Sequence, residues 1–162
     1  MLKLTQTSLY PKGNCWQTAV ACLLDIPAEQ LPSQADSYYS KIDRDSGETT
    51  WHMNYNNRLQ AYLKKHHKLA YIELWQPQEA LSQLRIVGYH LMSGTTVRSA
   101  AYGGQRHIVV GYEGKVFWDP HPSQAGLLDE IRWAVLCPFP PSWERYQNDA
   151  CECLACVGEP KQ

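Results

Sequence analysis

The sequence predicts an α+β domain in which two helices come first along the chain and an antiparallel sheet follows. Helical periodicity is confined to the stretch before residue 67, whereas five short runs with strand patterns lie between residues 69 and 136. Segregated helices and strands favour this class over an alternating α/β fold. The 162 residues are enough for one domain with a substantial core.

The first helix is expected to begin at Asn14 and Cys15 and to end before Pro27. Asn14 is a favourable N-cap, and Gln17 stands where a capping box needs it. One face of this helix is apolar and consists of Trp16, Ala19, Val20, Leu23 and Leu24. The helix is therefore expected to pack on the core.

The segment that follows is mostly polar. A further helical turn is expected at residues 28–31, whereas residues 33–50 lack periodicity and predict a long surface loop. The second helix is expected over residues 53–66, with one face formed by Tyr55, Leu59, Tyr62, Leu63 and His66.

The strands of the sheet are expected after the second helix, at residues 69–74, 87–92, 107–111, 115–118 and 131–136. A helical turn can form near residues 78–84. Prolines at 138, 140 and 141 then end regular structure. We expect one folded domain over residues 1–141 and a cysteine-containing tail over residues 142–162.

The bulk charge gives no sign of a nucleic-acid or membrane partner. The formal net charge is −1, from 15 Lys and Arg against 16 Asp and Glu, so no field attracts an anionic polymer or surface. The first ten residues are polar, unlike a secretory signal, and the longest apolar run, residues 19–24, is too short to cross a bilayer. Six cysteines without an export signal are expected to be thiols in the cytoplasm. The sequence predicts no oligomeric state.

Cys15 is the first residue that suggests chemistry. A thiol in the first turn of a helix lies near unpaired backbone N–H groups and the positive end of the helix dipole, which favour the nucleophilic thiolate. Gly13 lets a substrate approach the backbone closely, and the Cys15 N–H could donate to an oxyanion. The alternative is a small residue that packs at the start of a core helix.

A β-hairpin around Glu113 and Gly114 carries the second candidate group. A two-residue loop there would place Asp119 on the face opposite His107. A three-residue loop that includes Tyr112, with Gly114 in a left-handed conformation, would pair His107 directly with Asp119. The loop chemistry favours the second register, in which a carboxylate orients an imidazole.

Cys15, His107 and Asp119 together supply the nucleophile, base and orienting group of acyl-transfer chemistry. Residues 13–17 (GNCWQ), 107–110 (HIVV) and 118–122 (WDPHP) resemble the papain-like cysteine peptidases. The nearest resemblance is to the branch that processes double-glycine leaders of bacteriocins and to small proteins of bacteriophages and prophages. These segments make up 14 of the 162 residues.

The resemblance implies a papain-like fold, in which the Cys15 helix packs on the sheet that carries His107 and Asp119, and residues 1–141 as the catalytic domain. It implies a thiol hydrolase that cleaves a peptide or isopeptide amide of a protein or peptide substrate, in the cytoplasm of the host cell if the chain is phage-encoded. In that family a Gln about six residues before the Cys completes the oxyanion site. Leu9 stands there, so Gln6 or Asn14 takes this role.

Several alternatives stay open. The same triad could transfer an acyl group to an amine or deamidate a glutamine of a host protein, or the scaffold could be a non-catalytic binding protein. No cofactor is required, although zinc could be bound by Cys151, Cys153 and Cys156, with Cys137 or a histidine as fourth ligand. A metal site at His107, Asp119 and His121 would leave Cys15 without a role.

Overall fold

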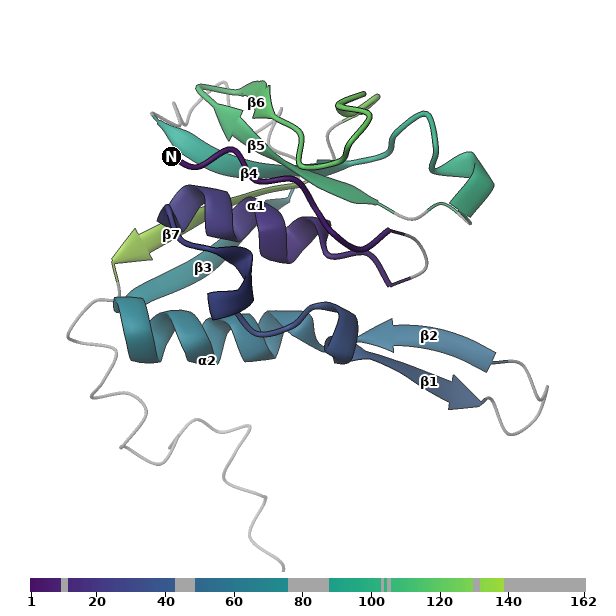
Figure 1. Ribbon diagram of the computed structural model, residues 1–162, viewed down its shortest axis with the longest axis horizontal. Coiled ribbons are helices and arrows are strands. Elements are labelled where there is room, and N and C mark those ends of the chain that lie inside the picture. Colours follow the sequence, from purple (N-terminus) through teal and green to yellow (C-terminus); the bar gives the residue numbers. More distant parts are fainter. Residues whose placement is uncertain are drawn as a thin grey trace, which may run out of the picture.

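The computed structural model in Figure 1 confirms the α+β class, with a helix packed on a five-stranded antiparallel sheet. It describes residues 1–9, 12–42, 49–75, 88–102, 104, 106–129 and 132–138. The predicted turn at residues 78–84, the domain boundary near residue 141 and the tail lie outside these ranges.

The sheet has the strand order β3-β7-β4-β5-β6, and every neighbouring pair is antiparallel. The five predicted strands are confirmed with small shifts at their ends: β3 (Leu69–Trp75), β4 (Tyr89–Gly94), β5 (His107–Tyr112), β6 (Lys115–Trp118) and β7 (Arg132–Pro138). β7, the last strand of the described chain, therefore lies inside the sheet, between β3 and β4.

Helix α1 (Cys15–Leu24) is buried on all sides and not only on the predicted apolar face. Every residue from 16 to 22 is buried, whereas Leu23 and Leu24 are only partly buried. The helix packs on β4 and β5, and the N-terminal segment lies along it (Figure 1). That segment is fixed because Leu4 accepts a hydrogen bond from the Trp118 indole at 2.8 Å. The start of the chain thus closes the core over α1.

The predicted cap of α1 is correct in position but wrong in its bonding. Asn14 occupies the N-cap, yet its side chain makes no capping hydrogen bond. The Gln34 side chain replaces it, because Gln34 Oε1 accepts from the Gln17 N–H at 3.0 Å. Gln17 Oε1 in turn accepts from the Gln34 N–H, also at 3.0 Å. A residue 17 positions away therefore caps the helix.

The predicted surface loop at residues 33–50 is wrong. It contains a short 3₁₀ helix, η2 (Ala35–Ser37), and leads into a hairpin of β1 (Tyr38–Ile42) and β2 (Thr49–Met53). The hairpin forms its own two-stranded sheet, away from the five-stranded one (Figure 1). Its sequence is rich in Tyr, Thr and Ile, which favour strands, but lacks the alternation that marks a core sheet.

The two other helical predictions are confirmed. The turn after α1 is η1 (Ala28–Gln30), and the second helix is α2 (Tyr55–His67), which packs on β3. Met53 belongs to β2, so α2 begins later than predicted. In the part of the chain that the structure describes, no helix combines the length and apolar character needed to span a bilayer.

The β5–β6 hairpin reaches the expected side-chain arrangement by a different route. Tyr112 pairs with Lys115, so the loop has two residues, and both Glu113 and Gly114 have positive φ (48° and 80°). The three-residue loop was therefore the wrong prediction. The register then shifts, because Gly111 pairs with Val116 but Val110 with Trp118.

This shift makes Phe117 the extra residue of a β-bulge. One added residue exchanges the two faces of everything beyond it, since side chains alternate along a strand. Asp119 is thereby returned to the face that carries His107.

Replacement of Gln34 by Ala should destabilise the fold by about 1–2 kcal/mol, because α1 loses its cap and the Gln17 amide loses a partner. Equilibrium urea unfolding measures the change. Gln30→Ala, an exposed glutamine on η1, is the matched control and should change stability by less than about 0.5 kcal/mol. Equal effects of the two substitutions would contradict the capping role.

Candidate active site

Cys15 is the first residue of α1, and its thiol is half-buried. The N–H groups of a first helical turn have no partner within the helix, so the Cys15 N–H is directed away from α1. Because α1 packs on β5, the thiol and His107 line the same cleft, and Cys15 helps to raise the pKa of His107. The fold therefore brings Cys15 at the start of α1 and His107 at the start of β5 to the same place.

His107 and Asp119 form a buried pair. Their exposed fractions are only 7% and 4%, and His107 Nε2 lies 2.6 Å from Asp119 Oδ1. A protonated Nε2–H donates to this carboxylate. Since Nε2 is occupied by Asp119, Nδ1 is the ring nitrogen left for the Cys15 thiol.

The surroundings of His107 favour its charged form. Burial of the imidazole lowers its pKa, but the hydrogen bonds to Asp119 and Cys15, and the negative charges of both, outweigh burial and raise the pKa to about 9. His107 is then an imidazolium at neutral pH. A positive imidazolium beside Cys15 stabilises a thiolate.

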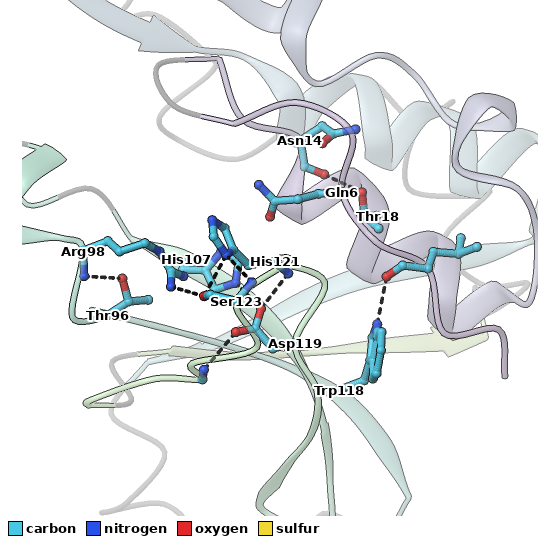
Figure 2. A network of polar contacts seen from close by, with 12 residues as sticks. Gln6, Asn14, Thr18, Thr96, Arg98, His107, Trp118, Asp119, His121 and Ser123 are labelled. Atoms are coloured by element: carbon cyan, nitrogen blue, oxygen red, sulfur yellow. Dashed lines mark hydrogen bonds and ion pairs between the residues drawn. The ribbon is translucent and has the colours of Figure 1, made fainter.

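Asp119 is held in place by three hydrogen bonds (Figure 2). Besides His107, the backbone N–H of His121 donates to Oδ1 and that of Gly126 to Oδ2, both at 2.8 Å. Burial raises the pKa of Asp119, but these hydrogen bonds and the charge of His107 lower it overall. The carboxylate therefore stays ionised and fixed in orientation.

The structure separates the two candidate oxyanion donors. Gln6 is buried and lines the same cleft as Cys15 and His107, and its Nε2 donates to the Ser8 carbonyl at 3.0 Å. An amide nitrogen carries a second hydrogen, which remains suited to an oxyanion. The Asn14 side chain is instead engaged with the N-terminal segment: its Nδ2 donates to Thr7 Oγ1, and its Oδ1 accepts from the Ser8 N–H.

Gln6, Cys15 and His107 line one cleft of about 380 Å³. Its size is in the range of small-molecule and peptide sites. The cleft is lined by residues from the N-terminal segment, α1, the sheet and three loops: Gln6, Leu9, Gly13, Cys15, Trp16, Gln34, Tyr71, Glu73, Ser93, Thr96, Arg98, Arg106, His107, Ile108, His121 and Arg132. Asp119 lies behind His107 and does not line it.

Sequence reasoning missed most of the cleft wall. His121 was considered only as a metal ligand and as part of the segment 118–122, yet its backbone holds Asp119 and its ring lies 5.9 Å from that of His107. Arg98 and Arg106 come from a loop that carries no motif. The Asp-Pro-His run after β6 was the one signal that could have marked His121 as part of the site.

Neither proposed metal site gains support. Over the ranges that the structure describes, no three or more His, Cys, Asp and Glu side chains gather as metal ligands would. This includes His107, Asp119 and His121. Cys151, Cys153 and Cys156, the predicted zinc ligands, lie outside those ranges. Cys15, Cys22 and Cys137 are free thiols.

Comparisons with known proteins add no relative: no family model, no curated protein and no solved structure matches this chain.

His107 should titrate near pH 9 in the wild type, and Asp119→Asn should lower its pKa because a hydrogen bond to a charged partner is lost. NMR of the imidazole nitrogens measures this, with Asp36→Asn, an exposed carboxylate, as the control. The wild-type pKa exceeds the ordinary 6.5, so the interaction stabilises the fold fully below about pH 6.5. This stabilisation is lost as the pH rises through about 9. A wild-type value near 6.5 would contradict the buried pair.

Deletion of Phe117 should separate Asp119 from His107, because a hairpin without the bulge places them on opposite faces. The expected result is a drop in the His107 pKa in a variant that still folds, as judged by circular dichroism. Phe117→Ala keeps the residue count and is the matched control. If the deletion leaves the His107 pKa unchanged, the bulge does not set the face of Asp119.

Proposed function

We propose that this protein is a cysteine hydrolase that cleaves a peptide or isopeptide amide through the triad of Cys15, His107 and Asp119. The supporting observation is that the imidazole is hydrogen-bonded to a buried carboxylate and shares a cleft with the thiol, which helps to raise its pKa. Acyl transfer of this kind needs a nucleophile, a base and a group that orients the base, and these three side chains supply them.

In the reacting form His107 holds the Cys15 proton, so that the pair is a thiolate and an imidazolium. In the first half-reaction the Cys15 thiolate attacks the substrate carbonyl carbon, and a C–S bond forms. The developing oxyanion accepts hydrogen bonds from the Cys15 N–H and from Gln6 Nε2. The His107 imidazolium then gives its proton to the leaving amine as the C–N bond breaks.

The second half-reaction releases the acyl group. Neutral His107 takes a proton from water, whose oxygen attacks the thioester carbonyl, and the Cys15 thiolate leaves as the C–S bond breaks. Asp119 stays ionised throughout and stabilises the imidazolium each time it forms. The cycle returns thiolate and imidazolium without net consumption of protein groups.

A papain-like fold is part of this proposal. Its support is the helix that carries the cysteine at its N-terminus and packs on the antiparallel strand that begins with the histidine. The arrangement of three groups on one cleft is the argument, since a fold by itself does not determine a reaction.

Cys15 should react with iodoacetamide at about pH 6 roughly tenfold faster than Cys137, because an imidazolium neighbour maintains a thiolate. Cys137 is the matched comparison, since it is also a half-buried free thiol. His107→Ala should remove the difference, and His66→Ala, on α2, should not. Peptide mass spectrometry over time measures each cysteine separately.

Two outcomes would contradict the proposal. The first is a Cys15 that reacts like Cys137, and the second is a fast Cys15 that ignores the loss of His107. With a substrate in hand, product mass separates hydrolysis (gain of water), transfer (gain of the amine) and glutamine deamidation (gain of about 1 Da as oxygen replaces NH). Cys15→Ser should abolish all three products.

A further inference from the structure

On the cleft wall, arginine side chains outnumber the carboxylates that could neutralise them. Glu73 contributes the only carboxylate in the described lining, and Arg132 Nη1 neutralises it at 2.9 Å. Arg98 and Arg106 also line the cleft, and within the described ranges neither makes an ion pair with a carboxylate. Beyond the triad, the cleft wall therefore carries an excess of positive charge.

Arg98 is held in a defined position (Figure 2). Its Nη1 donates to Ser123 Oγ at 2.5 Å, and its backbone N–H donates to Thr96 Oγ1 at 3.1 Å. Ser123 Oγ also contacts His121 Nδ1 at 2.9 Å. A guanidinium has five N–H donors, so this arrangement leaves donors for a ligand.

The loop that carries Arg98 is fixed to the loop that follows β6. The Thr95 N–H donates to Asp129 Oδ1 at 2.7 Å, and the Leu128 N–H donates to the Thr95 carbonyl at 2.8 Å. Gly94 permits this approach, because a Cβ there would overlap the Asp129 carbonyl. Arg98 therefore has a supported geometry and is not a free surface side chain.

The pKa values of two groups near the cleft respond to these arginines. Burial of the His121 ring, together with the charges of Arg98 and His107, lowers the pKa of His121, and the charge of Asp119 only partly opposes this. Hydrogen bonds from Thr95 and the charge of Arg106 lower the pKa of Asp129. Both arginines thus act on groups close to the cleft.

We propose that Arg98 and Arg106 form a subsite for a carboxylate of the substrate, next to the position where Cys15 attacks. The inference rests on the proposed function, because the cleft must hold a substrate. A planar guanidinium binds a carboxylate through two parallel hydrogen bonds, which fixes both the position and the orientation of the substrate. The carboxylate belongs either to an acidic side chain or to a free chain end.

The net charge of the whole chain, −1, gives no hint of this preference. Selection comes from local charge on the cleft wall, where Arg98 is half-buried and Arg106 is exposed. Substrates with a neutral group at this position would leave two arginines unmatched and bind less well.

Cys15 labelling tests the subsite without a known substrate. The rates with iodoacetate, an anion, and iodoacetamide, its neutral analogue, are compared by peptide mass spectrometry in the wild type, Arg98→Gln, Arg106→Gln and the double variant. The iodoacetate-to-iodoacetamide ratio should fall about fivefold in the double variant, because the field at Cys15 weakens. Lys115→Gln removes an exposed charge outside the cleft and should leave the ratio unchanged.

The two proposals fail in different ways. If Cys15 shows His107-dependent reactivity but the ratio is the same in all variants, the carboxylate subsite is overturned and the hydrolase proposal stands. If Cys15 has no His107-dependent reactivity at all, both are overturned. An unchanged iodoacetamide rate in the variants shows that the triad is intact, so a changed ratio supports the subsite.

Protection of Cys15 from iodoacetamide by short peptides distinguishes the sources of the carboxylate. The probes are acetyl-Ala-Asp-amide, acetyl-Ala-Ala with a free carboxyl end, and neutral acetyl-Ala-Asn-amide. Protection by the first alone assigns an acidic side chain, and protection by the second alone assigns a chain end. Protection by either peptide must be lost in the double variant that carries both Arg98→Gln and Arg106→Gln. Protection equal to that of the neutral peptide, or insensitive to these substitutions, overturns the subsite.

Discussion

The buried hydrogen bond between His107 and Asp119 is the constraint on which the rest of the site depends. Removing two charges from water costs several kcal/mol per ion unless their remaining polar atoms are satisfied. Here the carboxylate receives three hydrogen bonds, and the imidazole lies between that carboxylate and a thiol. Two of the three come from backbone N–H groups of the loop after β6, so the position of the carboxylate depends on the shape of this loop.

Packing of α1 determines whether the Cys15 thiol lies beside the His107–Asp119 pair. The helix is surrounded by the sheet, the N-terminal segment and α2, and Trp16 lies between Tyr55 and Tyr71 with ring centroids 5.2 and 5.5 Å away. A helix enclosed in this way cannot shift its first turn without opening the core. The position of Cys15 relative to His107 is therefore set by apolar packing, and the electrostatics of the pair follow from it.

Much of the fold and of the triad could be predicted because their signals are local. The start of α1, the position of α2 and the five strands follow from periodicity, and the hairpin between His107 and Asp119 follows from two apolar runs around Glu113 and Gly114. The β1–β2 hairpin was missed because its residues favour strands without the alternation that a core sheet imposes. In the hairpin before Asp119 the predicted loop length was wrong. A bulge at Phe117 nevertheless places Asp119 on the same face as His107, as predicted.

The sequence by itself predicted which residues form the candidate site and in which elements they lie, because helix starts, turns and alternation depend on near neighbours in the chain. Only the tertiary structure decided that Gln34 caps α1, that Gln6 and not Asn14 faces the cleft, and that Arg98 and Arg106 line it. Each of these depends on contacts between residues far apart in sequence. Such contacts are selected by packing and by the need to satisfy buried polar groups, and neither leaves a pattern along the chain.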